Sequence, residues 1–331
     1  QVRGLALARV SAVQRAGATT VQASTLTVAA ELVRLAGEHR WRVAPVGSGS
    51  KLHWTVGLAS SQSDRQDAGA TTDRQDAVAR LLHMDMRLCN RVVEYAPEDM
   101  TLTVESGITL ASLAETLSKH GQRITLDPPH AERATLGGVL AANDSGPIRF
   151  AYGTARDVVI GMSMIEADGE TIKSGGKVVK NVAGYDLHKL YIGSFGTLGP
   201  IATVTLRLRP LPEARGSVML EPRDAAEAER MTTVVLNGPT RPTFIELVNA
   251  PMAAAMDLGS APLLLIVGFE ENAQAVAWQC EQVAHALGGD QLTDRYAGEV
   301  YEKLKEASGA SAAAAMKISM LSSAVAAFVE R

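Results

Sequence analysis

The pattern of hydrophobic and polar positions divides the chain at two prolines, Pro210 and Pro212. Before them, apolar residues recur at helical spacing in some stretches and form short strand-like runs in others. The predicted helices are 27–39 and 109–120, the second with Gly121 as its C-cap. The predicted strands are 41–46, 91–96, 101–105, 157–167, 170–173 and 200–209, with a hairpin turn at 168–169.

Beyond Pro212, strands and helices alternate. Strands are predicted at 217–220, 243–248 and 263–269, and helices at 224–236, 274–287 and 299–307. The final KISMLSSAVAAFVER predicts a strand that leads into a helix. We therefore expect a first domain over 1–212 and a second, partial α+β domain over 213–331.

A polar stretch at 60–77 interrupts the first domain and contains DRQDA twice, at 64–68 and 73–77. Its composition is typical of a flexible surface insertion. A duplication without a function explains the repeat adequately.

Composition excludes several classes of protein. The 331 residues are 46% hydrophobic and 4% aromatic with a net charge of −4, which argues against nucleic-acid binding. No apolar run is long enough for a transmembrane span, and no leader opens the sequence. Cys89 and Cys280 are too few for an iron–sulfur or zinc site, so no metal is expected. Two reduced, buried thiols suit a cytoplasmic protein.

Three separated glycine-rich stretches carry the chemistry. They are VGSGSK at 46–51, ATLGGVLAANDSGP at 134–147 and KVVKNVAGYDLHKLYIGSFGTL at 177–198. Glycine costs backbone entropy, and it is used where a backbone must approach a bound group closely. Three such stretches predict one large ligand, a dinucleotide cofactor, that is contacted at several points.

Each stretch admits a functional and a structural interpretation. Gly47 and Gly49 suit an anion-binding nest for a pyrophosphate, although VGSGSK fits neither Rossmann nor Walker spacing and a plain turn is equally compatible. Thr135 is a good N-cap for a helix over 136–143, and Gly137 and Gly138 leave room for a flat ring at its start.

Charged residues beside these stretches are further candidates. His130, in the rigid lead-in DPPH, is either a catalytic or substrate-binding residue or a solvated loop histidine. Arg149 and Arg156 suit a phosphate or a substrate carboxylate, or form surface ion pairs with Asp144 or Asp157.

The order of these motifs resembles the FAD-binding domain of the vanillyl-alcohol oxidase (PCMH-type) flavoproteins. The motifs are GSGSK, DPPH-x-x-x-ATLGG, SGP-x-R, YG-x-x-RD, GG-x-VVKNVAGYDL, GSFGTLG and TLRLRPLP. The KNVAGYDL and DPPH blocks are similar to the FAD-binding subunits of bacterial glycolate oxidases. The resemblance covers residues 27–212 and implies an α+β fold of two FAD-binding subdomains, at about 1–90 and 91–212, followed by a partial cap over 213–331.

The resemblance also implies the cofactor site, with FAD bound non-covalently because the pyrophosphate loop has no histidine; attachment at His53, just after it, is the alternative. The implied pyrophosphate loop is Val46, Gly47, Ser48, Gly49, Ser50 and Lys51. The implied flavin and ribityl contacts are Pro128, Ala134, Thr135, Gly137, Gly138, Ser145, Gly146, Arg149, Gly153 and Asp157. Gly196, Leu198 and Ile201 are implied near the adenosine and pyrophosphate. Lys180, Asn181, Gly184 and Tyr185 are implied near the reactive face.

The implied function is that of the FAD-binding subunit of a glycolate oxidase-type complex. It would oxidise glycolate or a related 2-hydroxy acid to the 2-oxo acid, with His130, Lys180 or Tyr185 as catalytic residues. Electrons would pass to an iron–sulfur subunit, and a second flavin subunit would be another partner. Any association with the inner membrane would be made through these partners. Paired cap histidines and an Asn-Pro-Gly-Arg segment of relatives are missing after Pro212. A non-catalytic assembly subunit and a self-sufficient FAD-dependent oxidase therefore remain alternatives.

Overall fold

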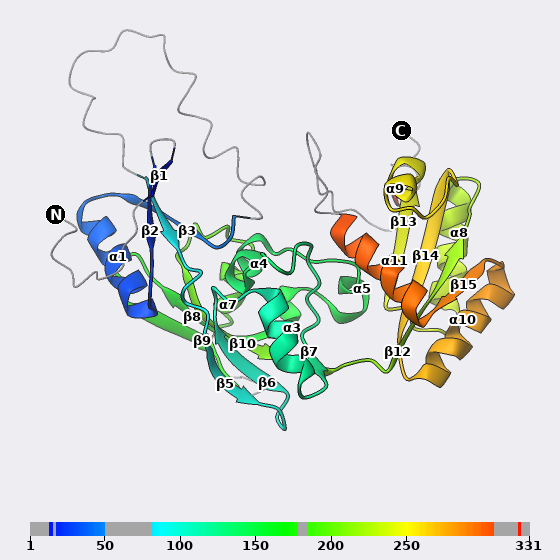
Figure 1. The fold of residues 1–331 in the computed structure, drawn as a ribbon, viewed down its shortest axis with the longest axis horizontal. Helices are drawn as coiled ribbons and strands as arrows, with labels where there is room; N and C mark the ends of the chain where they lie inside the picture. Colours follow the sequence, from blue (N-terminus) through cyan, green and yellow to red (C-terminus); the bar gives the residue numbers. More distant parts are fainter. Residues whose placement is uncertain (1–12, 16–17, 50–80, 178–184, 308–323, 326–331) are drawn as a thin grey trace, which may run out of the picture. The chain divides into compact units, whose positions relative to one another are not determined.

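The computed structural model describes residues 13–15, 18–49, 81–177, 185–307 and 324–325. The chain forms two compact units, whose elements are labelled in Figure 1. Unit 1 takes its described residues from 1–124, 130–144 and 155–209, and unit 2 takes them from 125–129, 145–154 and 210–331. Two short segments, 125–129 and 145–154, therefore belong to unit 2 although they precede its main part in the sequence. The hydrophobic pattern did not predict this.

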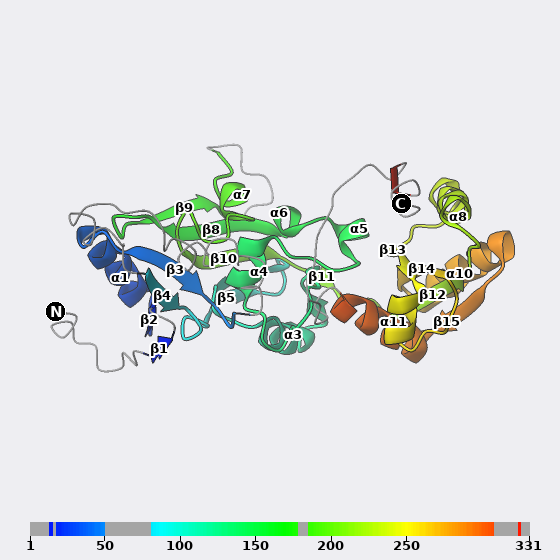
Figure 2. The same ribbon diagram turned by 90° about the horizontal axis from the view of Figure 1, so that it is seen from above.

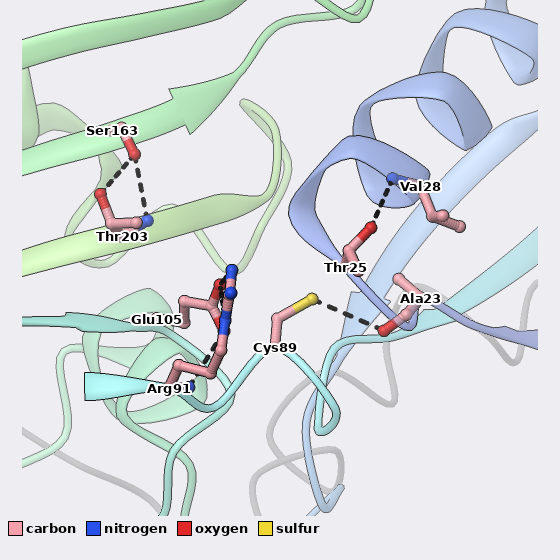
Figure 3. Close-up of polar contacts among 8 residues, drawn as sticks. All are labelled: Ala23, Thr25, Val28, Cys89, Arg91, Glu105, Ser163 and Thr203. Atoms are coloured by element: carbon pink, nitrogen blue, oxygen red, sulfur yellow. Dashed lines mark hydrogen bonds and ion pairs between the residues drawn. The ribbon is translucent and has the colours of Figure 1, made fainter. Parts of the chain in front are cut away.

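Unit 1 contains a four-stranded sheet in the order β1-β2-β4-β3. Its strands are β1 (Val13–Arg15), β2 (Ala18–Gln22), β3 (Arg42–Val46) and β4 (Leu81–Asp85). β4 is parallel to both β2 and β3, and β1 is antiparallel to β2. α1 (Leu26–Glu38) buries Leu32 and Val33 in the core of this sheet. It starts where the Thr25 hydroxyl accepts a hydrogen bond from the Val28 N–H (Figure 3).

A second sheet of unit 1 is antiparallel throughout, in the order β5-β6-β10-β8-β9. Its strands are β5 (Val92–Ala96), β6 (Thr101–Glu105), β8 (Val159–Ile165), β9 (Thr171–Gly175) and β10 (Ile201–Arg207). The predicted turn between β8 and β9 is confirmed, with Gly169 at φ 85°. Shorter elements are α3 (Leu110–Ser118), β7 (Gln122–Arg123), α4 (Leu136–Ala142), α6 (Ala155–Val158), α7 (His188–Tyr191) and β11 (Arg209–Pro210).

The two sheets of unit 1 meet just beyond the ends of β4 and β6. The Cys89 thiol donates a hydrogen bond to the Ala23 carbonyl, and Glu105, which is 1% exposed, pairs with Arg91 at 2.7 Å (Figure 3). Gly107 donates to the Cys89 carbonyl, and a Cβ at position 107 would lie 2.1 Å from the Met86 carbonyl oxygen. Glycine is therefore required at this junction.

Unit 2 is built on one antiparallel sheet in the order β13-β14-β12-β15. The strands are β12 (Ala214–Leu220), β13 (Phe244–Asn249), β14 (Leu263–Glu271) and β15 (Asp290–Thr293). α8 (Ala225–Asn237) and α10 (Ala273–Leu287) lie on one face of this sheet. α9 (Ala250–Ala255), α11 (Asp294–Ala307) and the short α5 (Arg149–Tyr152) pack on the other (Figure 2).

Some predicted boundaries are wrong. The helix predicted to end at His120 ends at Ser118 with Lys119 as its C-cap, and Gly121 follows as a left-handed turn residue at φ 64°. β8 begins only at Val159 because Asp157 belongs to the helical turn α6. The insertion at 60–77 and most of the C-terminal KISMLSSAVAAFVER lie outside the described residues. Both cysteines are unpaired and buried, as predicted.

The described helices include none with the length and apolar character needed to cross a membrane.

A buried carboxylate, Asp127, ties the segments of unit 2 together. It is 7% exposed and accepts hydrogen bonds from Gly146 N (2.9 Å), Ile148 N (3.1 Å) and the Tyr301 hydroxyl (3.1 Å). Burial raises the pKa of Asp127, and these three donors oppose that rise. Burial and the Asp127 charge also raise the pKa of Tyr301, which keeps the hydroxyl a donor. A carboxylate held in this way fixes residues 145–148 against α11.

Replacing Tyr301 by Phe removes one of the three donors and leaves Asp127 under-satisfied in the core. We expect the free energy of unfolding of unit 2 to fall by about 1–3 kcal/mol, measured by urea denaturation. The matched control is Tyr296→Phe on the same helix, since Tyr296 is 67% exposed. Equal stability of both variants and the unmodified chain would show that the Tyr301 hydrogen bond contributes nothing.

Candidate functional site

A cavity in unit 1 lies where several strands end and α4 begins. Backbone and side chains from five separate segments form its wall. The lining residues are Pro45, Val46, Gly47, Met86, Ser106, Thr135, Gly137, Gly138, Ala141, Gly196, Gly199 and Ile201. The glycine-rich stretches of the sequence thus contribute to one site from distant positions.

Strand pairing brings these segments together. β3 and β4 are parallel, so Val46 and Met86 emerge at the same end, and Met86 N donates to the Val46 carbonyl at 2.9 Å. Ser106 follows β6 directly beside the start of β10, where its hydroxyl donates to the Ile201 carbonyl at 2.5 Å. Both sheets of unit 1 therefore place a strand end at the cavity.

The start of α4 closes the cavity on another side. Thr135 is the N-cap, as predicted, and its hydroxyl accepts from Gly138 N at 3.4 Å. Gly137 N donates to the Ser106 carbonyl at 2.7 Å, and a Cβ at position 137 would lie 2.9 Å from the Ser106 Cβ. The prediction that glycine here leaves room for a ring is incomplete, because position 137 needs glycine first for the contact between α4 and Ser106.

The loop after β3 fits an anionic guest. A Cβ at Gly47 would lie 2.1 Å from the Thr135 hydroxyl, so glycine lets the loop approach α4. Gly49 takes φ 78°, which side chains disfavour. The Ser48 hydroxyl is buried and has no hydrogen-bond partner among the described residues. A buried hydroxyl is costly without a partner, and a phosphate oxygen of a dinucleotide is a suitable one.

Seven residues predicted for the cofactor line this cavity. They are Val46, Gly47, Thr135, Gly137, Gly138, Gly196 and Ile201. Sequence reasoning missed Pro45, Met86, Ser106, Ala141 and Gly199, whose positions depend on strand pairing. Of the other predicted residues in unit 1, Ala134 is buried, Leu198 is 44% exposed, and the Asp157 carbonyl accepts from Arg207. Ser50, Lys51, Lys180, Asn181 and Gly184 lie outside the described residues.

The remaining predicted flavin contacts form a group of their own in unit 2: Pro128, Ser145, Gly146, Arg149 and Gly153. Three of these, Ser145, Gly146 and Arg149, line a second cavity of about 540 Å³. β13, α9 and α11 supply most of its remaining wall, including Glu246 and Met252.

Glu246 is a residue that sequence reasoning missed. It lies in FIELVN of β13, on the face that carries Phe244 and Val248 into the core. Burial, together with the charge of Asp127, raises the pKa of Glu246 to about 7. The signal in the sequence is one acidic residue within the mostly apolar strand FIELVN.

The structure locates two of the three catalytic candidates. His130 takes φ 62°, and its carbonyl accepts from Arg133 N and Ala134 N in the turn before α4. Tyr185 is 91% exposed, and the third candidate, Lys180, is outside the described residues. The Arg156 guanidinium donates to the carbonyls of Lys189 and Ile192. Within the described ranges, no group of three or more His, Cys, Asp or Glu side chains is placed to hold a metal ion.

Glu246 predicts a pH dependence of stability. Its pKa is about 7 in the folded chain against an ordinary 4.5, so the folded state holds the proton more tightly. The free energy of unfolding therefore falls as pH rises from about 4.5 to 7 and stays low above that. We expect Glu246→Gln to remove this fall and to exceed the unmodified chain in stability at about pH 8, by up to about 3 kcal/mol. The check is denaturation at pH 5 and pH 8, with the exposed Glu281→Gln as control; parallel pH profiles for all three proteins would contradict it.

Comparison with known proteins identifies an FAD-binding domain in the chain. Residues 68–175 match the family described as FAD binding domain. The chain is 30% identical over 67% of its length to glycolate oxidase subunit GlcE of Escherichia coli (strain K12), of which it covers 58%. It is 28% identical over 66% of its length to glycolate oxidase subunit GlcD of Bacillus subtilis (strain 168), of which it covers 43%. It is 32% identical over 62% of its length to the mitochondrial D-lactate dehydrogenase (cytochrome) of Arabidopsis thaliana, of which it covers 37%.

The fold agrees with this relationship. A solved structure of alkyldihydroxyacetonephosphate synthase superimposes with a TM-score of 0.66 at 20% identity, over 88% of this chain and 56% of that one. The chain spans about half the length of the relatives it matches. The chain therefore contains an FAD-binding domain of the PCMH type, and FAD is its cofactor.

Proposed function

We propose that this chain is the FAD-binding subunit of a glycolate oxidase-type complex. It oxidises glycolate or a related 2-hydroxy acid to the 2-oxo acid and passes the electrons to an iron–sulfur subunit. The observation that carries this proposal is the agreement between the unit 1 cavity and the relatives. Seven of the predicted FAD contacts line one cavity, in a chain whose relatives include glycolate oxidase subunits and a D-lactate dehydrogenase.

In this proposal unit 1 binds the dinucleotide. The Ser48 hydroxyl donates to a phosphate oxygen, and Gly47 allows the loop to approach Thr135 closely enough to form the wall. The backbone contact between Gly137 and Ser106 holds α4 in place beside the loop. Bound FAD supplies the two-electron acceptor that no side chain can provide.

The proton of the substrate hydroxyl needs an acceptor. We propose His130 for this role, with Lys180 and Tyr185 as the other candidates. The strained backbone of His130 supports the choice, because residues held at positive φ are enriched at functional sites. An assembly subunit without its own turnover is distinguished from this proposal by the anaerobic spectrum. An oxidase that needs no partner is distinguished by rapid reoxidation of its reduced flavin by O2 alone.

The direct test is the visible spectrum of the purified chain under anaerobic conditions, before and after addition of glycolate or D-lactate. We expect a flavin absorbance band that either substrate bleaches. A flavin band that stays unchanged until the iron–sulfur and second flavin subunits are added would assign a relay or assembly role instead. A chain that carries no flavin and takes up none from added FAD would contradict the proposal.

The assignment of Ser48 makes a separate prediction. Ser48→Ala removes a charge-assisted hydrogen bond to phosphate, so we expect FAD affinity to fall by about tenfold while the apo chain keeps its stability. Flavin fluorescence titration and thermal unfolding measure the two quantities. The control is Ser118→Ala, because Ser118 is exposed at the end of α3 and its hydroxyl donates to the Glu115 carbonyl. Unchanged FAD affinity in Ser48→Ala would show that the loop after β3 does not bind the phosphate through this hydroxyl.

A further inference from the structure

The second cavity, within unit 2, combines a charged wall and an apolar wall. Arg149 and Glu246 are its charged residues, and Ser145 and Asn249 are polar. The apolar wall is formed by Val248, Met252, Leu263, Leu304 and Ala307. At about 540 Å³ it lies within the range of small-molecule sites.

The two charged groups of this cavity are a partly buried carboxylate, that of Glu246, and an exposed guanidinium, that of Arg149. Among the residues that the structure describes, neither the Arg149 guanidinium nor the Glu246 carboxylate takes part in an ion pair or hydrogen bond, including with each other. A partly buried carboxylate without a donor is unfavourable, and a cation on the same cavity normally pairs with it. A ligand that offers an anionic group to one and a donor to the other satisfies both.

Both groups are carried by rigid parts of unit 2. Arg149 follows Ile148, which is 2% exposed and whose N–H is held by Asp127. Glu246 lies within β13, and every residue of that strand pairs antiparallel with β14. α5, which carries Arg149, packs on β13. The fold therefore fixes the backbone positions from which the two side chains reach the cavity.

We infer that this cavity binds a 2-hydroxy acid whose side chain is apolar and larger than that of lactate. Arg149 binds the carboxylate, and the 2-hydroxyl donates its hydrogen bond to Glu246, so a ligand in this cavity has Glu246, and not His130, as its acceptor. The side chain lies against Met252, Leu263 and Leu304. The hydroxy-acid class rests on the proposed function, whereas the cation, the acceptor and the apolar wall are read from the cavity.

The apolar wall decides the size of the ligand. Glycolate has no side chain and lactate has only a methyl group, so either would leave this wall in contact with water. Each additional methylene removed from water strengthens binding. An unbranched or branched aliphatic chain attached to C2 would cover the apolar wall and exclude water from it.

Isothermal titration calorimetry of the full chain tests the inference, with 2-hydroxyhexanoate, glycolate and hexanoate as probes. We expect 2-hydroxyhexanoate to bind at least about tenfold more tightly than glycolate, because of its buried side chain. We also expect it to bind about tenfold more tightly than hexanoate, which lacks the donor for Glu246.

Variants assign the two roles. Arg149→Gln should weaken 2-hydroxyhexanoate and hexanoate alike, by at least about tenfold, because both carry the carboxylate. Glu246→Leu, which removes the acceptor, should bring the two ligands to within about threefold of each other, mainly by weakening 2-hydroxyhexanoate. The matched control is Arg230→Gln, an exposed arginine on α8 at the opposite face of the sheet, which should leave all affinities unchanged.

Two results would overturn the inference: glycolate binding as tightly as 2-hydroxyhexanoate, or Arg149→Gln leaving carboxylate affinity intact while lowering FAD affinity. The second result would show that Arg149 contacts the flavin, as the family resemblance implies. Calorimetry reports binding whether or not the flavin is reduced, so failure of the proposed redox function leaves this test readable. Conversely, bleaching by glycolate with no preference for the larger acid would refute the inference and support the function.

Discussion

Close backbone packing at the start of α4 is the constraint on which the cofactor site depends. Three segments meet there with almost no side chains in the way: the loop after β3, the turn after β6 and the first turn of α4. A Cβ at Gly47 would reach the Thr135 hydroxyl, and one at Gly137 would reach Ser106. These segments are held by backbone hydrogen bonds and N-capping, and glycines and other small residues form much of the cavity wall. Such a wall presents the peptide groups and small side chains that a dinucleotide needs.

Unit 2 is organised by a different interaction, the burial of a carboxylate. Asp127 gathers two backbone N–H groups and a tyrosine hydroxyl, which joins residues 145–148 to α11. Burial raises the pKa of Glu246 and the Asp127 charge adds to that rise, so the anchor also influences the neighbouring cavity. Arg149 is presented from the anchored segment. One buried acid thus positions the segment that carries Arg149 and contributes to the raised pKa of Glu246, and both residues line the same cavity.

Much of this could be predicted from the sequence, and the limits have physical causes. The helix over residues 27–39, the Thr135 cap and the β8–β9 turn follow from local periodicity and turn chemistry, and they occur nearly as expected. Met86 and Ser106 were missed because only strand pairing brings them to the cavity. The role of Asp127 was missed because its partners lie far along the chain, at Gly146 and Tyr301. Glu246 gave a local signal, an acid in an apolar strand, but its surroundings depend on how the sheet is covered.

Hydrogen–deuterium exchange with and without FAD tests the central claim, the position of the cofactor, most directly. The account predicts slower exchange in peptides covering residues 45–49, 134–138 and 196–201 when FAD is bound, since these segments form the wall of the unit 1 cavity. Binding of FAD that leaves all three segments unchanged and protects other parts of unit 1 would contradict it.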